Sequence, residues 1–326
     1  MHIGSLHLKN NILLAPLAGI TDLPYRLIMR RHGIGLAFTE MVSANGLVRA
    51  GRNTEALLHS TKEDHPLGVQ LFGDDPQILA KAAAQVEDRG ELIDLNLGCP
   101  VKKVIRSGAG SALLQTPSKI GQIVAAVRGV ISCPLTVKLR SGWDSSSINY
   151  LEVGRIAEAE GADALTLHPR TRCQAFSGRA DWSHITRLKE AVTVPVIGSG
   201  DIGSAEDAQA MLDETGCDGI MLGRGCYGNP WLISSILASR EGQPCPAPDP
   251  DPLQRLEAVR SHFELFVAYF GEHKARLDMR KHLCWYSRGL PNAAAFRTRI
   301  NETHSFAELQ QVTEDFFHAA VDFVEN

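Results

Sequence analysis

The residues best suited to chemistry surround Cys99. An apolar run, Ile93–Leu97, carries the polar Asn96 and leads directly into the turn Gly98-Cys99-Pro100. Gly98 permits unusual backbone angles and Pro100 fixes its own φ, so the sequence predicts a thiol held in one direction at the carboxyl end of a strand. A cysteine is more often a small buried hydrophobe, but the turn around this one favours a displayed, reactive Cys99.

Other candidate residues lie at the ends of further apolar runs. They are Gln70, Asn96, Lys138, Arg140, His168 and Arg170. None is acidic, which argues against the carboxylate pair of a glycosidase and against an Asp, Glu and His cluster for a divalent metal. We therefore predict no metal site. Lys138 leaves two chemistries open, because its amine could form a Schiff base or could hold negative charge on a reduced flavin ring.

Two glycine-rich loops follow the last two predicted strands. They read Gly198-Ser199-Gly200-Asp201 and Gly223-Arg224-Gly225. Glycines can merely turn the chain, but in many barrel enzymes the loops at these two places expose backbone N–H groups to a phosphate. Arg224 adds a guanidinium that can bind an anion through two hydrogen bonds. The two loops together indicate a site for a phosphorylated cofactor or substrate.

Alternating strand and helix patterns must position these residues. Short apolar runs bounded by turn residues predict eight strands, near Ile12–Ala15, Leu36–Thr39, Gly68–Leu71, Leu92–Leu95, Leu135–Leu139, Ala164–Leu167, Val194–Ile197 and Gly219–Leu222. Helical periodicity is found near Pro24–Arg31, Pro76–Asp88, Pro117–Val130, Tyr150–Glu160, Trp182–Ala191, Ala205–Glu214 and Pro230–Ala238. Eight β/α units of this length predict an α/β TIM (β/α)8 barrel rather than a doubly wound sheet.

Composition indicates a globular protein with free thiols. The 326 residues are 44% hydrophobic and 21% charged, with a net charge of −4. No apolar run is long enough to span a membrane and no signal peptide precedes the first strand, so we expect a cytoplasmic protein with no membrane partner. The seven cysteines contain no C-x-x-C pair, so neither a disulfide framework nor a zinc or iron–sulfur site is predicted. We expect a monomer.

A proline-rich segment separates the barrel from a helical tail. Residues 243–252 hold five prolines and predict a stiff linker between a domain at 1–242 and a helical domain at 253–326. Between Lys274 and Arg299, seven basic residues face one acidic residue, a local charge of +6. Such a run is often a solvated helix face, but the interleaved His282, Trp285 and Tyr286 also suit RNA. RNA is the favoured partner.

With these residues assembled, the chain resembles the bacterial tRNA-dihydrouridine synthases along nearly its whole length. The motifs that carry the resemblance are Ala15-Pro-Leu-Ala-Gly-Ile-Thr-Asp22, Thr39-Glu-Met-Val-Ser43, Asp94-Leu-Asn-Leu-Gly-Cys-Pro100, Gly108-Ala-Gly-Ser-Ala-Leu-Leu114, Val137-Lys-Leu-Arg140, Leu167-His-Pro-Arg-Thr-Arg172, Ser199-Gly-Asp201 and Leu222-Gly-Arg224. The resemblance implies a flavoprotein oxidoreductase of tRNA processing. It would contain FMN, use NADPH, and reduce a uridine in the D-loop region of tRNA to 5,6-dihydrouridine.

The resemblance also implies roles for single residues. Cofactor-binding residues would be Pro16, Leu17, Ala18, Gln70, Lys138, His168, Ser199, Gly200, Asp201, Gly223 and Arg224. Hydride would pass from flavin N5 to uracil C6, Cys99 would protonate C5, and Asn96 and Arg140 would help to fix the base. The predicted contacts to tRNA phosphates are Arg276, Arg280, Lys281 and Arg297.

Three other functions stay open at this point. An FMN barrel acting on a free pyrimidine, such as a dihydroorotate or dihydropyrimidine dehydrogenase, would share the cysteine region but would not need the basic tail. A tRNA-binding protein or chaperone with an inactive barrel would not need Cys99, Lys138 and His168. A Schiff-base aldolase would use Lys138 alone. The sequence does not determine which tRNA position is modified.

Overall fold

The computed structural model describes residues 1–244 and 249–322, which form two compact units. The first unit consists of Met1–Asp22, Ile34–Ile202 and Glu206–Gly223. The second consists of Leu23–Gly33, Gly203–Ala205 and the chain from Arg224 onward. The second unit thus begins before most of the first unit has been completed in sequence.

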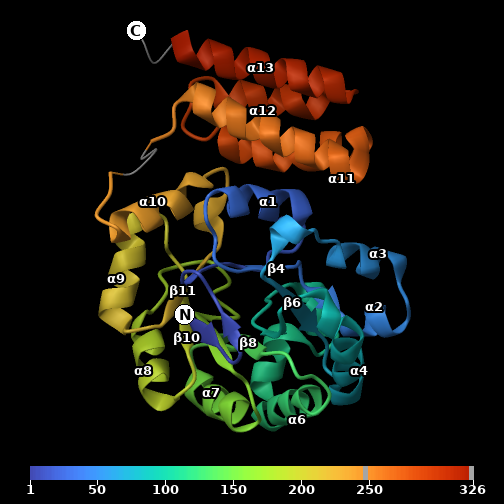
Figure 1. The fold of residues 1–326 in the computed structure, drawn as a ribbon, viewed down its shortest axis with the longest axis vertical. Coiled ribbons are helices and arrows are strands. Elements are labelled where there is room, and N and C mark those ends of the chain that lie inside the picture. Colours follow the sequence, from blue (N-terminus) through green and yellow to red (C-terminus); the bar gives the residue numbers. More distant parts are fainter. Residues whose placement is uncertain (245–248, 323–326) are drawn as a thin grey trace. The chain divides into compact units, whose positions relative to one another are not determined.

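The first unit is a barrel of parallel strands (Figure 1). Within the described residues the ring contains eight strands: β3 (Ile12–Leu14), β4 (Ala37–Phe38), β6 (Leu67–Phe72), β7 (Leu92–Leu97), β8 (Leu135–Gly142), β9 (Ala164–Thr171), β10 (Val196–Ser199) and β11 (Gly219–Leu222). Each pairs with its neighbour, and the ring closes where the Leu14 N–H donates to the Leu36 carbonyl at 2.9 Å. The predicted TIM barrel is confirmed.

The strands are almost entirely buried because both their faces are covered. One core cluster combines residues of the segment before β3 with residues of the ring strands and their flanks: Ile3, Leu8, Leu13, Ala15, Leu36, Phe38, Leu92, Ala164, Ile197 and Met221. The helices between the ring strands include α2 (Ala44–Val48), α3 (Arg52–Glu55), α4 (Pro76–Val86), α5 (Lys102–Arg106), α6 (Pro117–Arg128), α7 (Tyr150–Ala159), α8 (Ser183–Ala191) and α9 (Ala205–Thr215). In α4, Pro76 occupies the first turn and Asp75 caps it by accepting from two backbone N–H groups.

Some short elements were not predicted from the sequence. A two-stranded hairpin of β1 (His2–Ile3) and β2 (Leu6–His7) precedes the ring, and β5 (Val42–Ser43) pairs with β6. Single turns of 3-10 helix occur at η1 (Ala56–Leu58), η2 (Lys62–Asp64) and η3 (Glu87–Arg89), with a longer one at η4 (Gly110–Gln115). Two-residue strands are too short to show a periodicity of two.

The second unit is helical. It contains α1 (Leu23–Arg31), η5 (Arg224–Cys226), α10 (Trp231–Arg240), α11 (Pro252–Tyr286), α12 (Ala293–Glu302) and α13 (Phe306–Asp322). Helix α11 is broken at Gly271, whose φ of +77° an L side chain rarely adopts. A core of aliphatic and aromatic side chains, including Phe263, Phe266, Phe296 and Phe317, joins α11, α12 and α13. The predicted helical tail therefore has a core of its own.

The compact units do not follow the predicted domain boundaries of 1–242 and 253–326. By compactness, α1 and α10 group with the tail rather than with the barrel, and the first unit ends at Gly223. Part of the predicted linker, residues 245–248, lies outside the described residues, and its last residue, Pro252, already begins α11. The predicted boundaries follow local sequence signals such as the proline-rich segment. The compact units instead reflect packing between distant segments, because α1 packs on α11.

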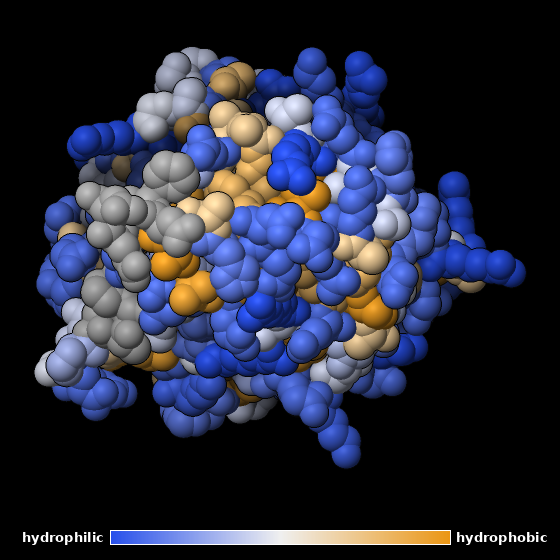
Figure 2. Space-filling view, turned by 90° about the horizontal axis from the view of Figure 1, so that it is seen from above, coloured by the Kyte–Doolittle hydropathy of each residue, from blue (hydrophilic) through white to orange (hydrophobic). Residues whose placement is uncertain are grey.

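Among the described residues, no helix is both long and apolar enough to cross a membrane. Seen from above, hydrophilic side chains cover most of the visible face, with apolar residues in small patches between them (Figure 2).

Candidate active site

Strand register brings the predicted polar residues to one side of the barrel wall. Gln70 pairs with Asp94 across β6 and β7, Asn96 with Lys138 across β7 and β8, and Arg140 with His168 across β8 and β9. Strands β8 and β9 extend beyond their predicted ends at Leu139 and Leu167, so Arg140 and His168 lie within paired backbone. Paired residues project to the same face of a sheet, so residues far apart in sequence share one site.

A chain of hydrogen bonds runs through the site. Gln70 donates from Nε2 to Asp94 Oδ2 at 2.6 Å, and its Oε1 accepts from Asn96 Nδ2 at 2.8 Å. Thr136 donates from Oγ1 to Asp94 Oδ1 at 2.6 Å. Asp94 and Gln70 are fully buried. Burial raises the pKa of Asp94 to about 6, although the bonds from Gln70 and Thr136 act in the opposite direction.

The same chain of bonds ends at the turn that carries Cys99. Asn96 Oδ1 accepts from the Gly98 N–H at 3.1 Å and from the Cys99 N–H at 2.9 Å. The Cys99 carbonyl accepts from Ser111 Oγ at 2.8 Å. Gly110 has φ +62°, and a Cβ there would lie 2.9 Å from that carbonyl. The turn is therefore anchored from both sides.

The Cys99 thiol is partly buried and protonated at neutral pH. Burial raises its pKa from the ordinary value of 9.0, while a backbone hydrogen bond from Val101 and the charges of Arg140 and Lys138 oppose the rise. Lys138 is itself partly buried, and desolvation, followed by the charge of Arg140, lowers its pKa to about 8. The site thus holds a neutral acid beside an amine that titrates near neutrality.

Arg140 joins two loops. Its side chain is 2% exposed, and it donates to the carbonyls of Gly98 at 2.9 Å, Thr171 at 2.8 Å and Ala175 at 2.7 Å. Three backbone acceptors hold the guanidinium next to the Cys99 turn. The contact of Arg140 with a substrate base therefore stays a prediction. The structure adds a role that the sequence did not reveal, because Arg140 anchors the Cys99 turn to the loop after β9.

Arg170 joins the loop after β9 to the first glycine-rich loop. It is 2% exposed and binds both carboxylate oxygens of Asp201, at 2.9 and 2.8 Å. It also donates to the carbonyls of Ser177 and Gly178 and lies 3.2 Å from His168 Nε2. The Asp201 carboxylate thus faces a guanidinium, and its predicted place in a phosphate site stays a prediction.

The other predicted cofactor-binding residues lie at or just after the carboxyl ends of β3, β10 and β11. Ser199 ends β10 and donates to the Met221 carbonyl, and Gly200 and Asp201 have positive φ values of 120° and 58°. Pro16, Leu17 and Ala18 follow β3 with partly or fully exposed side chains. Gly223 follows β11. Arg224 begins η5 in the second unit.

The predicted RNA-binding residues are divided between two environments in the helical unit. Arg276 and Arg280 each donate to the Thr303 carbonyl at 2.8 Å, so part of their hydrogen-bonding capacity is used within the fold. Lys281 is partly buried, whereas Arg297 is exposed. Arg297 is therefore the member of this set that is most open to a phosphate.

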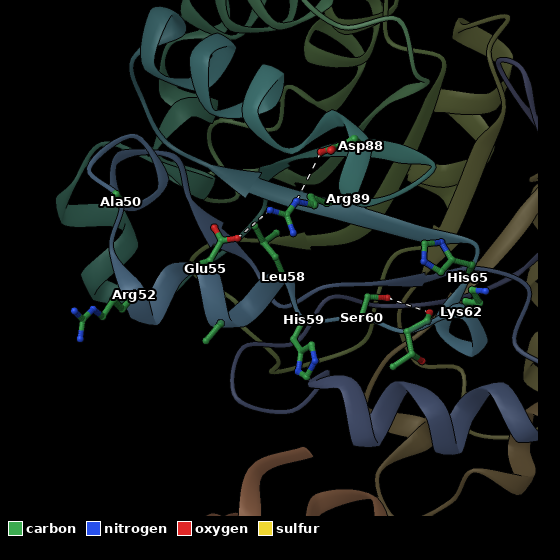
Figure 3. Close-up of a pocket in the computed structure, with 12 residues that line it drawn as sticks. Ala50, Arg52, Glu55, Leu58, His59, Ser60, Lys62, His65, Asp88 and Arg89 are labelled. Carbon is green, nitrogen blue, oxygen red and sulfur yellow. Dashed lines mark hydrogen bonds and ion pairs between the residues drawn. The ribbon is translucent and has the colours of Figure 1, made fainter. Parts of the chain in front are cut away.

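A separate pocket of about 960 Å³ lies in the first unit and contains none of the predicted residues. It is lined by residues of α3, η1 and η2 and by residues that precede β6 and β7, among them His65 and Arg89 (Figure 3). Arg89 is paired with Glu55 at 3.3 Å. Barrel enzymes have their active sites at the carboxyl ends of the strands, so this pocket is not the candidate active site.

Among residues 1–244 and 249–322, no group of three or more His, Cys, Asp or Glu side chains is arranged to hold a metal ion. The donors collected in the site are instead an amide, an amine, an imidazole and backbone N–H groups. Such a set can bind an uncharged or anionic ring system and an attached phosphate.

Sequence comparisons identify similar proteins of one kind. The sequence model of a family described as "Dihydrouridine synthase (Dus)" matches residues 13–321. A probable tRNA-dihydrouridine synthase of Rickettsia bellii is 39% identical over 325 residues, which cover 98% of either chain. A tRNA-dihydrouridine synthase B of Pasteurella multocida is 41% identical over 319 residues, covering 98% of this chain and 96% of that protein.

Solved structures support the fold alone. A 2-naphthoyl-CoA reductase is similar with a TM-score of 0.58 at 13% identity, over 75% of this chain and 52% of that one. A histamine dehydrogenase from Rhizobium sp. 4-9 is similar with a TM-score of 0.52 at 15% identity, over 81% of this chain and 50% of the other.

Proposed function

Because the chain belongs to the dihydrouridine synthase family, we propose that it reduces a uridine in the D-loop region of tRNA to 5,6-dihydrouridine, with FMN as cofactor and NADPH as reductant. The observation that carries this proposal is the anchored Cys99 turn beside Lys138, with a thiol whose pKa is raised by burial. An acid must hold its proton until the reaction needs it, and this thiol does so at neutral pH.

The residues of the first unit fit FMN. Pro16, Leu17 and Ala18 offer a small, partly exposed surface for a flat ring. Gln70 and Lys138 supply an amide and a cation for its polar edge, with His168 close by. When bound and reduced, FMN would supply the hydride that reaches C6 of the uracil.

Backbone geometry after β10 supports a phosphate site. Gly200 and Asp201 have successive positive φ values, which turn their N–H groups away from the regular strand direction. Such turns form concave sites for anions. In the proposal these N–H groups, together with Ser199, Gly223 and Arg224, bind the FMN phosphate, while Arg170 neutralises the Asp201 carboxylate.

Cys99 gives its proton to C5 of the uracil in this proposal. Asn96 and Arg140 fix the turn that holds the thiol, and in the proposal they also help to fix the base. The uracil must leave the folded tRNA to reach them, as single-stranded loop recognition usually requires. The basic helical unit would bind tRNA phosphates through Arg297 first, with Arg276, Arg280 and Lys281 assisting.

The test is anaerobic reduction of FMN-loaded protein by NADPH, followed by reoxidation with a tRNA transcript that lacks modifications. Wild-type protein should be reoxidised and should produce dihydrouridine. Cys99→Ala should still accept electrons from NADPH but lose about 10²–10⁴-fold in the reoxidation rate, the usual contribution of a positioned acid. Cys173→Ala, an exposed cysteine of the same unit, is the matched control and should behave as wild type.

Other outcomes would replace the proposal. Reoxidation by free uridine as fast as by tRNA would favour a free-pyrimidine dehydrogenase. Protein that binds tRNA but cannot be loaded with FMN would favour a chaperone. Borohydride trapping of a carbonyl compound on Lys138 would favour an aldolase.

A further inference from the structure

Asp94 has no role in the function proposed above, yet it is fully buried in the centre of the site. Its two carboxylate oxygens accept from Gln70 Nε2 and Thr136 Oγ1, each at 2.6 Å. A buried carboxylate without such bonds would be strongly destabilising. The bonds to Gln70 and Thr136 therefore stabilise the carboxylate, and they also constrain the orientation of the side chains that make them.

A carboxylate determines the orientation of the amide beside it. An ionised carboxylate can only accept hydrogen bonds, so Gln70 must turn its NH₂ group toward Asp94. The Gln70 carbonyl oxygen then points to Asn96 and accepts from its Nδ2 at 2.8 Å. Asn96 is left with its own carbonyl oxygen directed at the N–H groups of Gly98 and Cys99.

The reverse orientation cannot hold the turn. If both amides were flipped, Asn96 would present an NH₂ group to two backbone N–H donors, and all of them would lack an acceptor. Leaving donors unpaired is costly even at these partly buried positions. The direction of the whole chain of bonds therefore depends on the group at its far end.

We propose that Asp94 is a positioning residue, which orients the amides of Gln70 and Asn96 and through them fixes the turn that carries Cys99. Asp94 does not touch the reacting atoms. Its importance for catalysis rests on the proposed function, but the positioning itself can be measured in the free protein.

The experiment measures alkylation of single cysteines by iodoacetamide, using peptide mass spectrometry on the purified full-length protein. Asp94→Ala should raise the Cys99 rate by about fivefold, the equivalent of one lost hydrogen bond. Asp94→Asn should restore the wild-type rate, because its Oδ1 can accept from Gln70 while its Nδ2 donates to the Thr136 hydroxyl. Cys217, which is 6% exposed in the same unit, reports any general opening of the barrel.

Two further variants test the direction of the chain. Gln70→Met removes the middle link at similar volume and should raise the Cys99 rate as Asp94→Ala does. Thr136→Val removes a bond of equal length from the same carboxylate but lies outside the path to Cys99, so the rate should not change. These variants keep the test decisive if Asp94→Ala does not fold.

The proposal is overturned if Cys99 keeps its wild-type rate in Asp94→Ala and Gln70→Met while Cys217 stays protected. A parallel rise at Cys217 in both variants overturns it as well, because general destabilisation would then explain the result. Neither outcome depends on FMN, NADPH or tRNA, so a failure of the proposed function is detected separately, by the reoxidation experiment.

Discussion

The Cys99 thiol lies in a site that keeps it uncharged at neutral pH. Burial raises its pKa from 9.0, and the opposing charges of Arg140 and Lys138 do not reverse that direction. We therefore predict that the alkylation rate of Cys99 in the wild-type protein rises with pH through a midpoint above 9.0, measured by the peptide method described above. A midpoint below 8 would mean that the cations dominate and that the thiol is a nucleophile rather than a proton donor.

Lys138 is expected to titrate within the working range of the enzyme. Its pKa of about 8 means that the ammonium is present below pH 8 and is lost as the pH rises further. An anionic ligand that depends on this charge should bind about tenfold more weakly one unit above that pKa. We predict such a decline in the affinity for reduced FMN between pH 7 and 9, measured by anaerobic equilibrium dialysis, and a flat profile for Lys138→Gln. Equal slopes for both proteins would remove Lys138 from the cofactor site.

At the scale of elements, the ion pair of Arg170 and Asp201 connects the ends of β9 and β10. Asp201→Ala would leave a guanidinium that is 2% exposed without its carboxylate. Because Asp201 itself is partly exposed, we predict a loss of about 2 kcal/mol in the free energy of unfolding, below the usual range for fully buried pairs. Residues 172–180 should also become more sensitive to protease.

The control for that variant is Asp181→Ala. Asp181 is an exposed carboxylate that binds Ser183 and lies near His184 at the start of α8. Its loss should lower stability by about 1 kcal/mol or less, as expected for the loss of an exposed hydrogen-bond acceptor. If both variants lose equally, the Arg170 bridge has no special importance.

The second unit contains a pair of buried histidines in an aromatic environment. The rings of His262 and His282 lie 4.6 Å apart on α11, and Tyr25 from α1 contacts both, while Phe266, Trp285 and Tyr286 surround them. Burial lowers the pKa of His262 to about 3, and the charges of Lys281 and Arg31 add to the effect. The folded unit therefore excludes a proton that the unfolded chain binds below pH 6.5.

This exclusion predicts an acid-sensitive helical unit. Stability rises with pH wherever the unfolded state binds more protons, so it should fall as the pH drops from 6.5 toward 3. The free energy of unfolding should be lower at pH 5 than at pH 7, and His262→Phe should remove about 2 kcal/mol of that difference. The measurement is urea unfolding followed by tryptophan fluorescence. An unchanged difference would show that His262 is protonated in the folded protein.

Sequence patterns located the long elements well and the hydrogen-bond partners poorly. The eight ring strands could be predicted because strands buried on both faces are continuous apolar runs between turn residues. Cys99, Lys138 and His168 could be singled out by their residue type at strand ends. The roles of Asp94 and Arg170 could not, because Thr136 is 42 residues from Asp94 and Asp201 is 31 residues from Arg170. No local pattern specifies such pairs.

At the scale of the whole molecule, the sequence located the concentration of positive charge but did not show which basic side chains are bonded within the fold. The run from Lys274 to Arg299 carries +6, yet Arg276 and Arg280 bind the Thr303 carbonyl and Lys274 pairs with Asp278. In a plot of log affinity for tRNA against log salt concentration, we predict that Arg297→Ala reduces the magnitude of the slope by about one, which corresponds to one lost phosphate contact. The stability of the protein should not change. Arg155→Ala, an exposed arginine on α7, should leave the slope unchanged.

The division of the chain into units also has a consequence for the order of synthesis. Helix α1 is complete at Arg31, but α11, on which it packs, begins only at Pro252. A growing chain therefore carries the first helix of the second unit without its packing partner while every ring strand from β4 to β11 is made. Translation that stopped after residue 242 would release a protein with Tyr25 deprived of both histidines, which chaperones and proteases would recognise as incomplete. The packing around Tyr25 is thus completed only after both histidines of α11 have been synthesised.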